Sequence, residues 1–253
     1  MTQTVNVHLL PSLTTRQQLA GKTVVVIDVL RASTTIVHAL AAGALEIVPC
    51  LEVDEAREIA RNSELPTILG GEREGLKIDG FDFGNSPQEY VPENVAGKRI
   101  VFTTTNGTRA LLQCRLAKRV VIGAFVNCST VCSSVGDEPA IDLLCAGTKK
   151  EISCEDVLLA GAIVEQLQQT RGPHIVLNDQ ALLAVGAWRS IQDNRMEPEG
   201  LAKALAKSQG GRNLVAIGQQ RDIEIAARTD QFEMVPELDR ESWQIRAAID
   251  RSG

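Results

Sequence analysis

Short runs of aliphatic residues alternate along the chain with longer segments of helical spacing. The runs are rich in Val and Ile and bounded by Gly, Pro or Asn; several are apolar throughout, as in strands covered on both faces. They predict strands at 4–10, 22–29, 45–50, 67–70, 98–103, 119–125, 140–146, 174–178 and 232–236. The segments between them predict helices at 33–43, 53–62, 107–117, 154–170, 179–193, 198–208 and 239–250.

This alternation favours the α/β class, and specifically a layered α/β/α fold around a largely parallel or mixed central sheet. Three segments, beginning near residues 24, 99 and 141, each read strand, polar turn, helix, which is compatible with an internal repeat. We expect one domain over residues 1–253 and leave a subdivision near 97 open. Ligands of such sheets bind at the carboxyl ends of the strands, so the three polar turns become the candidate site.

Composition narrows the class of protein. The 253 residues are 44% hydrophobic but only 3% aromatic, so an aliphatic core is expected. The net charge of −6 argues against a nucleic-acid partner. The amino terminus does not resemble a signal peptide, and no apolar run reaches the ~18 residues of a membrane helix. We therefore expect a cytoplasmic protein without a membrane partner, whose six cysteines are reduced and mostly buried.

The stretch TTTNGTR (103–109) joins a predicted strand to a predicted helix. Free N–H groups of a first helical turn attract anions. Asn106-Gly107 would permit positive φ, and Arg109 offers a bidentate fork. Hydroxyl donors come from Thr104, Thr105 and Thr108. The alternative, an Asn-Gly turn with a threonine cap, accounts for only part of this set. The stretch therefore predicts an anion cradle.

Carboxylates stand in the other two turns. Asp28 ends an apolar run and Arg31 follows three residues later. Asp28 could cap the next helix, but a strand-end carboxylate beside an arginine also brings Mg²⁺ and a phosphate together. In the third turn, Ser153 and Asp156 fit a capping box, whereas Glu155 has no such role.

Residues 70–90 fit neither helix nor strand. The segment contains glycines at 70, 71, 75, 80 and 84 and three of the six Phe and Tyr residues of the chain. A disordered linker would not concentrate scarce aromatic residues, so we expect an ordered loop packed against a site.

Common catalytic motifs are absent. The chain has neither a P-loop nor a GxGxxG fingerprint, and Asp28 lacks the second aspartate of haloacid-dehalogenase phosphatases. No cysteine precedes an arginine at the spacing of cysteine phosphatases, and His8, His38 and His174 lie in no motif.

Five blocks do resemble a known family. VVVIDVLRASTTI, GGEREGLKIDGFDFGNSP, TTTNGTRAL, CAGT with the following ED and LLAGAIV, and the late RDIEIAA are similar, in order, to the 2-phosphosulfolactate phosphatases of coenzyme M biosynthesis. The resemblance implies a distinct α/β fold and Mg²⁺-dependent hydrolysis of (2R)-2-phospho-3-sulfolactate. Lys149-Lys150 and Cys154 depart from the family pattern, and the lysines alter the charge near the predicted site.

The residues and the resemblance together assign the roles. Catalytic residues are expected to be Asp28, Arg31 and Arg109, and the Mg²⁺ ligands Asp28, Glu72 and Glu155. Substrate contacts are expected from Arg73, Lys77, Asn85, Ser86, Thr104, Thr105, Asn106, Gly107, Thr108, Gly147 and Thr148. The expected partner is a small phosphorylated substrate bearing sulfonate and carboxylate groups; a homodimer is left open.

Two alternatives remain at this point. The chain could be a phosphatase for another small phosphorylated acid, or a non-catalytic anion-binding protein. Asp28 and Glu155 argue against the second, because an anion binder gains nothing from nearby carboxylates unless a cation intervenes.

Overall fold

A single mixed β-sheet organises the molecule. The computed structural model describes residues 3–172, 174–192 and 198–248. On one side of the sheet, five strands run parallel: β7 (Arg119–Gly123), β2 (Thr23–Ile27), β8 (Ala140–Cys145), β1 (Thr4–His8) and β9 (Val176–Leu177). On the other side three more run parallel: β3 (Glu46–Cys50), β6 (Arg99–Thr103) and β4 (Thr67–Arg73), with β5 (Leu76–Lys77) antiparallel at the edge.

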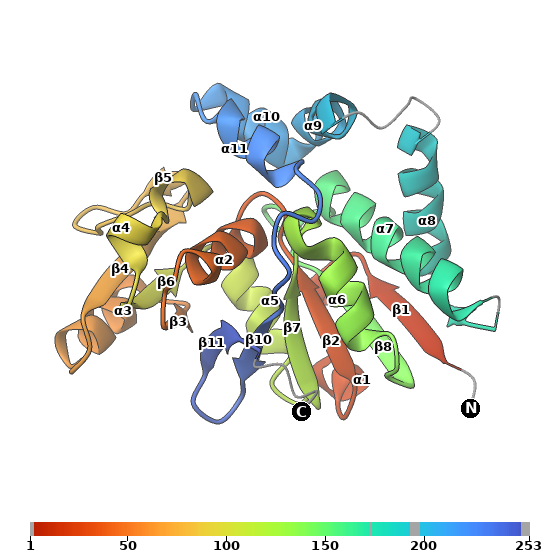
Figure 1. Ribbon diagram of the computed structural model, residues 1–253, viewed down its shortest axis with the longest axis horizontal. Helices are drawn as coiled ribbons and strands as arrows, with labels where there is room; N and C mark the ends of the chain where they lie inside the picture. The colour runs from red at the N-terminus through yellow and green to blue at the C-terminus, as the bar shows by residue number, and fades with distance from the viewer. Residues whose placement is uncertain (1–2, 173, 193–197, 249–253) are drawn as a thin grey trace.

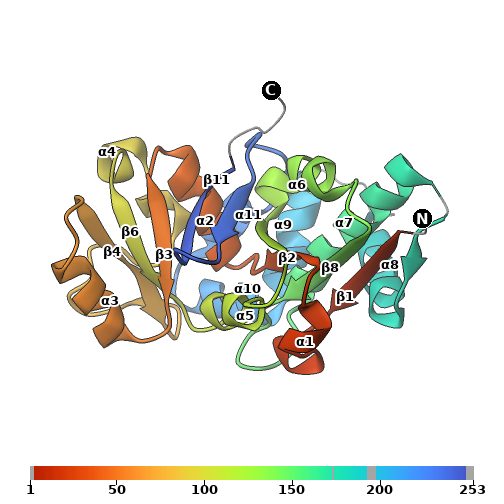
Figure 2. The ribbon, with the colours of Figure 1, turned by 90° about the horizontal axis from the view of Figure 1, so that it is seen from below.

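A C-terminal hairpin joins these two groups. Strands β10 (Pro236–Asp239) and β11 (Gln244–Ala247) pair with each other, β10 is antiparallel to β7, and β11 is antiparallel to β3. Figure 2 shows the blue hairpin between the two groups. The α/β class and the mixed sheet are therefore confirmed.

Helices cover both faces of the sheet. One face packs against α6 (Cys128–Val135), α7 (Cys154–Arg171) and α8 (Asp179–Gln192), and the other against α1 (Arg16–Leu19), α2 (Ala32–Ala41) and α5 (Gly107–Gln113). β2 is buried at every position because its side chains alternate between the two cores: Val25 and Ile27 face α7, whereas Val24 and Val26 face the other. Burial of one such side chain contributes about 1.5–3 kcal/mol.

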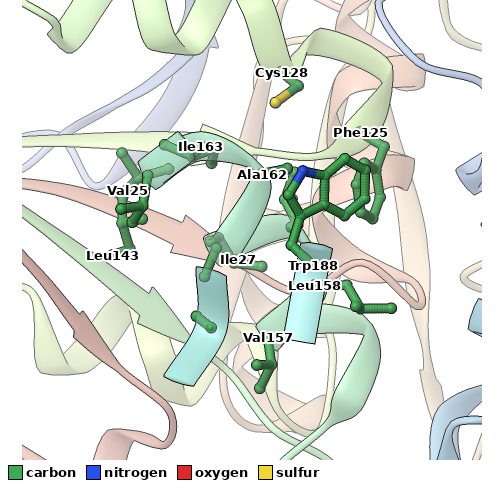
Figure 3. Packing of buried hydrophobic residues seen from close by; sticks show 14 of the residues in the cluster. Val25, Ile27, Phe125, Cys128, Leu143, Val157, Leu158, Ala162, Ile163 and Trp188 are labelled. Atoms are coloured by element: carbon green, nitrogen blue, oxygen red, sulfur yellow. The ribbon is translucent and has the colours of Figure 1, made fainter. Parts of the chain in front are cut away.

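The first core is aliphatic with one aromatic pair. Figure 3 shows Leu158 and Ile163 of α7 among side chains of β2 and β8. Phe125 and Trp188 belong to the same cluster, with their ring centroids 5.8 Å apart. The chain therefore builds its core from aliphatic residues, as its composition predicted.

Smaller elements surround these layers. α3 (Val53–Arg61) and α4 (Pro92–Val95) belong to the half that contains β3, β4 and β6, and 3-10 turns span Pro11–Leu13, Pro87–Glu89 and Phe125–Asn127. At the top of Figure 1 lie α9 (Pro198–Lys207), α10 (Gln209–Ala216) and α11 (Gln220–Ala226). Within the described ranges, no helix combines the length and apolarity needed to span a bilayer.

Two element predictions at the C-terminus are wrong. The strand predicted at 232–236 begins only at Pro236, and the helix predicted at 239–250 is instead a turn followed by β11. Asp239 Oδ1 accepts hydrogen bonds from the backbone N–H groups of Glu241 and Ser242, which closes the turn. Leu238 and Ile245 are then buried opposite each other between the two strand groups. Pairing and burial thus override the local helical preference.

The glycine-rich segment is ordered, as predicted, but the expectation that it contains no strand is wrong. β4 continues to Arg73, turns through Glu74 and Gly75 at positive φ, and returns as β5. Tyr90 packs edge-on against Phe83 and Phe102 and donates a 2.7 Å hydrogen bond to the Gly84 carbonyl. The scarce aromatic residues therefore anchor this segment to β6. The internal repeat and the single-domain prediction stay predictions.

Candidate active site

Asp28 immediately follows β2; it binds the start of α2 and also faces the turn that precedes α5. Its Oδ1 accepts a 3.1 Å hydrogen bond from Ala32 N–H, and its backbone N–H donates to Ser33 Oγ at 2.8 Å. Asp28 therefore caps the start of α2, which is the role that the sequence offered as the alternative to metal binding. The carboxylate is only 8% exposed, and its Oδ2 is directed toward Gly107 at the start of α5.

Gly107 is needed for close approach, which corrects the expectation of positive φ. Neither Asn106 (φ −109°) nor Gly107 has positive φ. A Cβ on Gly107 would lie 2.8 Å from Ala32 Cβ and 3.0 Å from Asp28 Oδ2. Only glycine lets β2 and the 103–109 turn meet. The cavity between them has a volume of about 10 Å³ and is lined mostly by apolar side chains, among them Val26, Phe102 and Ile122.

The threonines divide into two kinds. Thr104 Oγ1 accepts from Thr108 N–H at 3.3 Å, and Thr108 Oγ1 accepts from Thr104 N–H at 3.4 Å, which closes a local cap. Thr105 Oγ1, by contrast, is buried without a partner among the described residues. The backbone N–H groups of Asn106 and Gly107 likewise have no acceptor in the part of the chain that is described. The donors left for an anion are therefore fewer than predicted.

Glu72 and Asp156 use their carboxylates to hold turns together. Glu72 accepts from Thr105 N–H at 2.8 Å and Gly75 N–H at 2.7 Å. Asp156 accepts from Val29 N–H at 2.9 Å and Gly147 N–H at 3.0 Å, which ties the ends of β2 and β8.

The capping box predicted for Ser153 and Asp156 is wrong. Ser153 donates to Thr148 Oγ1 at 2.6 Å instead of capping α7. Asp156 faces the ends of the strands, so its carboxylate meets backbone donors there.

These carboxylates crowd one another. Burial, with a contribution from Glu72 and Glu155, raises the pKa of Asp28 to about 7, although the Ala32 N–H and Arg31 act in the opposite direction. Burial also raises the pKa of Glu155 above its usual range. Burial and the charges of Glu155 and Asp28 raise the pKa of Asp156 well above normal. Burial and mutual repulsion therefore favour the protonated forms of these carboxyl groups, and a bound cation would favour their ionised forms.

The predicted metal ligands are close but do not form a ready-made cage. Within the described ranges, no three acidic, histidine or cysteine side chains converge on one point. Mg²⁺ needs only one or two carboxylates, because it keeps waters and binds phosphate oxygens. Glu155 Oε2 is buried without a partner among the described residues, and Asp28 Oδ2 accepts no hydrogen bond from them. The available donors thus fit this cation.

Arg31 is locked in a buried network. It is 4% exposed, pairs with Asp222 at 2.8 Å, donates to the Gly75 carbonyl at 2.8 Å, and contacts Gln219. Asp222 also accepts from Ser86 Oγ at 2.7 Å and from Gln88 Nε2 at 2.9 Å. Sequence reasoning named Arg31 and Ser86 but missed Asp222 and Gln219. The RDIEIAA block (221–227), which resembles the family, was the only indication in the sequence that Asp222 matters.

Arg73 and Arg109 occupy opposite environments. Arg73 donates to the carbonyls of Glu72 (2.8 Å) and Leu51 (2.7 Å), so its guanidinium supports the backbone. Arg109 is exposed on α5 and forms no ion pair within the described residues. Its role toward an anion stays a prediction.

Gly147 and Thr148 build a tight turn. Gly147 has φ +71°, and a Cβ there would collide with Leu10 and the Glu151 carbonyl. Thr148 and Glu151 exchange backbone hydrogen bonds at 2.9 Å around Lys149 and Lys150, both at positive φ. The exposed lysines therefore project from a turn at the end of β8.

A larger pocket, of about 460 Å³, adjoins this site. One wall comes from residues 75–89 and the other from residues 218–221. It includes the predicted residues Lys77, Asn85 and Ser86. Its size is that of a small-molecule site.

Comparison with known proteins points to one family. A sequence model described as 2-phosphosulpholactate phosphatase matches residues 8–241. A protein of Caldanaerobacter subterraneus named "Probable 2-phosphosulfolactate phosphatase" is 39% identical over 224 residues, which is 88% of this chain and 90% of the relative. A protein of Symbiobacterium thermophilum with the same name is 41% identical over 222 residues, 87% of this chain and 92% of the relative.

Proposed function

The chain belongs to the 2-phosphosulpholactate phosphatase family, and on that premise we propose that it hydrolyses 2-phospho-3-sulfolactate to 3-sulfolactate and inorganic phosphate with Mg²⁺ as cofactor. It is a phosphoric monoester hydrolase. The observation that carries the assignment of the site is Asp28, a buried carboxylate of raised pKa that faces the Gly107 turn.

The 103–109 turn would hold the phosphoryl group. The N–H groups of Asn106 and Gly107 and the hydroxyl of Thr105 are among the donors of this turn without partners in the described residues. Charge spreads over the phosphoryl oxygens during transfer, so donors fixed in place before reaction lower the barrier. Arg109 would add its guanidinium from the exposed side of α5.

Asp28 would handle the proton of the attacking water. A base works best when its pKa lies near the working pH; the pKa of Asp28 is about 7 without a cation, and bound Mg²⁺ would lower it. The water oxygen bonds to phosphorus while its proton passes to Asp28. The bond from phosphorus to the substrate C2 oxygen breaks, and that oxygen then takes up a proton. The other route is direct attack of the Asp28 carboxylate on phosphorus.

Asp28 and Glu155 would hold Mg²⁺, with Glu72 nearby. Bound there, the cation would neutralise developing charge on the phosphoryl oxygens. The support is the excess of buried carboxylates and the unpartnered Glu155 oxygen.

Phosphate release tests the proposal directly. Rates should be compared for 2-phospho-3-sulfolactate, phospholactate and phosphoglycolate, each with Mg²⁺ and after chelation. We expect the highest kcat/KM for 2-phospho-3-sulfolactate and loss of turnover on chelation. A higher kcat/KM for another acid would reassign the substrate, and no release from any would indicate an anion-binding protein. As a separate readout, Mg²⁺ should raise the unfolding temperature of the wild type more than that of Glu155→Gln.

A further inference from the structure

The 460 Å³ pocket carries two positive charges on opposite walls. Lys77 belongs to β5, and Arg221 lies at the start of α11. Figure 1 places β5 and α11 on facing parts of the molecule. Arg221 is exposed and forms no hydrogen bond or ion pair within the described ranges, and Lys77 has only a 3.5 Å contact with the Asp82 carbonyl. In a chain of net charge −6, two such cations around one hollow indicate an anionic ligand.

The remaining polar groups of the pocket include one carboxylate and one buried amide. The Glu89 carboxylate accepts from the backbone N–H groups of Gly84 and Ser86, at 3.0 and 3.4 Å, and is therefore engaged by its own loop. Asn85 is 5% exposed, and its Oδ1 has no partner among the described residues. Because an amide oxygen only accepts hydrogen bonds, a bridging water would stand between Asn85 Oδ1 and an anion bound here.

The pocket and the Asp28 cluster are neighbours through Arg31 and Glu72. Gly75 and Gln219, one from each wall, both contact Arg31. Gly75 N–H also donates to Glu72, which binds Thr105 N–H. A small molecule with its phosphate at the 103–109 turn would thus have its other end on this side.

We propose that the pocket binds the sulfonate and carboxylate groups of the substrate, the part that is not transferred, and that Arg221 and Lys77 determine specificity for it. The inference rests on the proposed function, since it names the chemistry of the same substrate. Arg221 can offer two parallel donors to a sulfonate or carboxylate, whereas Lys77 supplies a single charged donor.

Binding of 3-sulfolactate, which has no phosphate, tests the pocket without turnover. We expect calorimetric Kd to rise about tenfold or more in Arg221→Gln and in Lys77→Gln. Arg240→Gln is the matched control, because Arg240 is also exposed and has no partner within the described residues. Wild-type affinity in Arg221→Gln, or no binding by the wild type, would overturn the proposal.

Kinetics separate this inference from the proposed function. p-Nitrophenyl phosphate lacks a second anionic group, so Arg221→Gln should lower kcat/KM at least tenfold more for 2-phospho-3-sulfolactate than for p-nitrophenyl phosphate. An equal loss for both substrates would refute the specificity role. A wild-type enzyme that hydrolyses only p-nitrophenyl phosphate would refute the proposed substrate. The binding of 3-sulfolactate would then still test whether the pocket binds sulfonate and carboxylate groups.

Discussion

Two buried aspartates, Asp222 and Asp28, differ in how their oxygens are used. Asp222 accepts hydrogen bonds from Arg31, Ser86 and Gln88. Asp28 accepts one from the Ala32 N–H and faces other carboxylates, and burial raises its pKa to about 7. The difference indicates that the first aspartate holds the fold together and the second is available for chemistry.

The largest effect is expected from Asp28→Asn. It removes the proposed base and a proposed metal ligand, so kcat/KM should fall about a thousandfold, roughly 4 kcal/mol of transition-state stabilisation. The unfolding temperature should stay the same or rise at pH 8, because a poorly solvated charge is removed. Steady-state phosphate release and thermal unfolding measure both.

A matched control is available in the same sheet. Asp142 is also fully buried but is paired with His8 at 2.5 Å and Lys22 at 3.1 Å. Asp142→Asn should lower the unfolding temperature and leave kcat/KM of the folded enzyme intact. Full activity in Asp28→Asn would remove Asp28 from the mechanism.

Asp222→Asn should affect stability most. It leaves Arg31 charged and buried without a carboxylate, at a cost of about 3–5 kcal/mol in the free energy of unfolding. Urea unfolding measures this loss. Asp54→Asn breaks a pair in which the aspartate is 97% exposed and should cost less than ~0.5 kcal/mol. Equal losses in the two variants would contradict the contrast between the aspartates.

The pH dependence of stability should also come from Asp28. Its pKa is about 7 when folded and 3.8 as a model group, so between these values the folded chain binds the extra proton. The contribution of this carboxyl group to the free energy of unfolding is therefore fully present below pH about 4. It declines as pH rises to about 7, by at most ~4 kcal/mol. Urea unfolding of wild type and Asp28→Asn across this window should show the smaller decline in the variant. Parallel curves would show that Asp28 titrates normally.

The smallest effect is expected from Gly107→Ala. Its methyl group would press on Ala32 and Asp28, which costs about 1–3 kcal/mol and displaces the proposed carboxylate. Activity should fall more than tenfold. Gly186→Ala is the control, since a Cβ there meets nothing within 4 Å on α8 and should stabilise the helix by about 0.5–1 kcal/mol. An active, stable Gly107→Ala would show that the close approach is unimportant.

Local pattern determined much of the fold. Strands from β1 to β4 and from β6 to β8, and helices such as α2, α3 and α7, lie within a few residues of their predicted bounds. The short α6 was missed because CSTVCSSV contains weak helix formers, and it is held by the burial of Val131 and Val135. The hairpin of β10 and β11 was missed because its strands are defined by partners more than 100 residues away.

The sequence by itself determined which side chains follow the ends of strands, such as Asp28 and Thr105, and which begin a helix, such as Glu155, because period and turn residues are local properties. Only the tertiary structure decided their use. Arg31 and Asp222 are 191 residues apart in the chain, and no local spacing predicts their ion pair. Gly107 is required by the close approach of Ala32 and Asp28, which lie about 75 residues earlier in the chain, not by its own φ. Contacts depend on how distant segments pack, and packing decides which buried polar groups are satisfied and which remain available for a ligand.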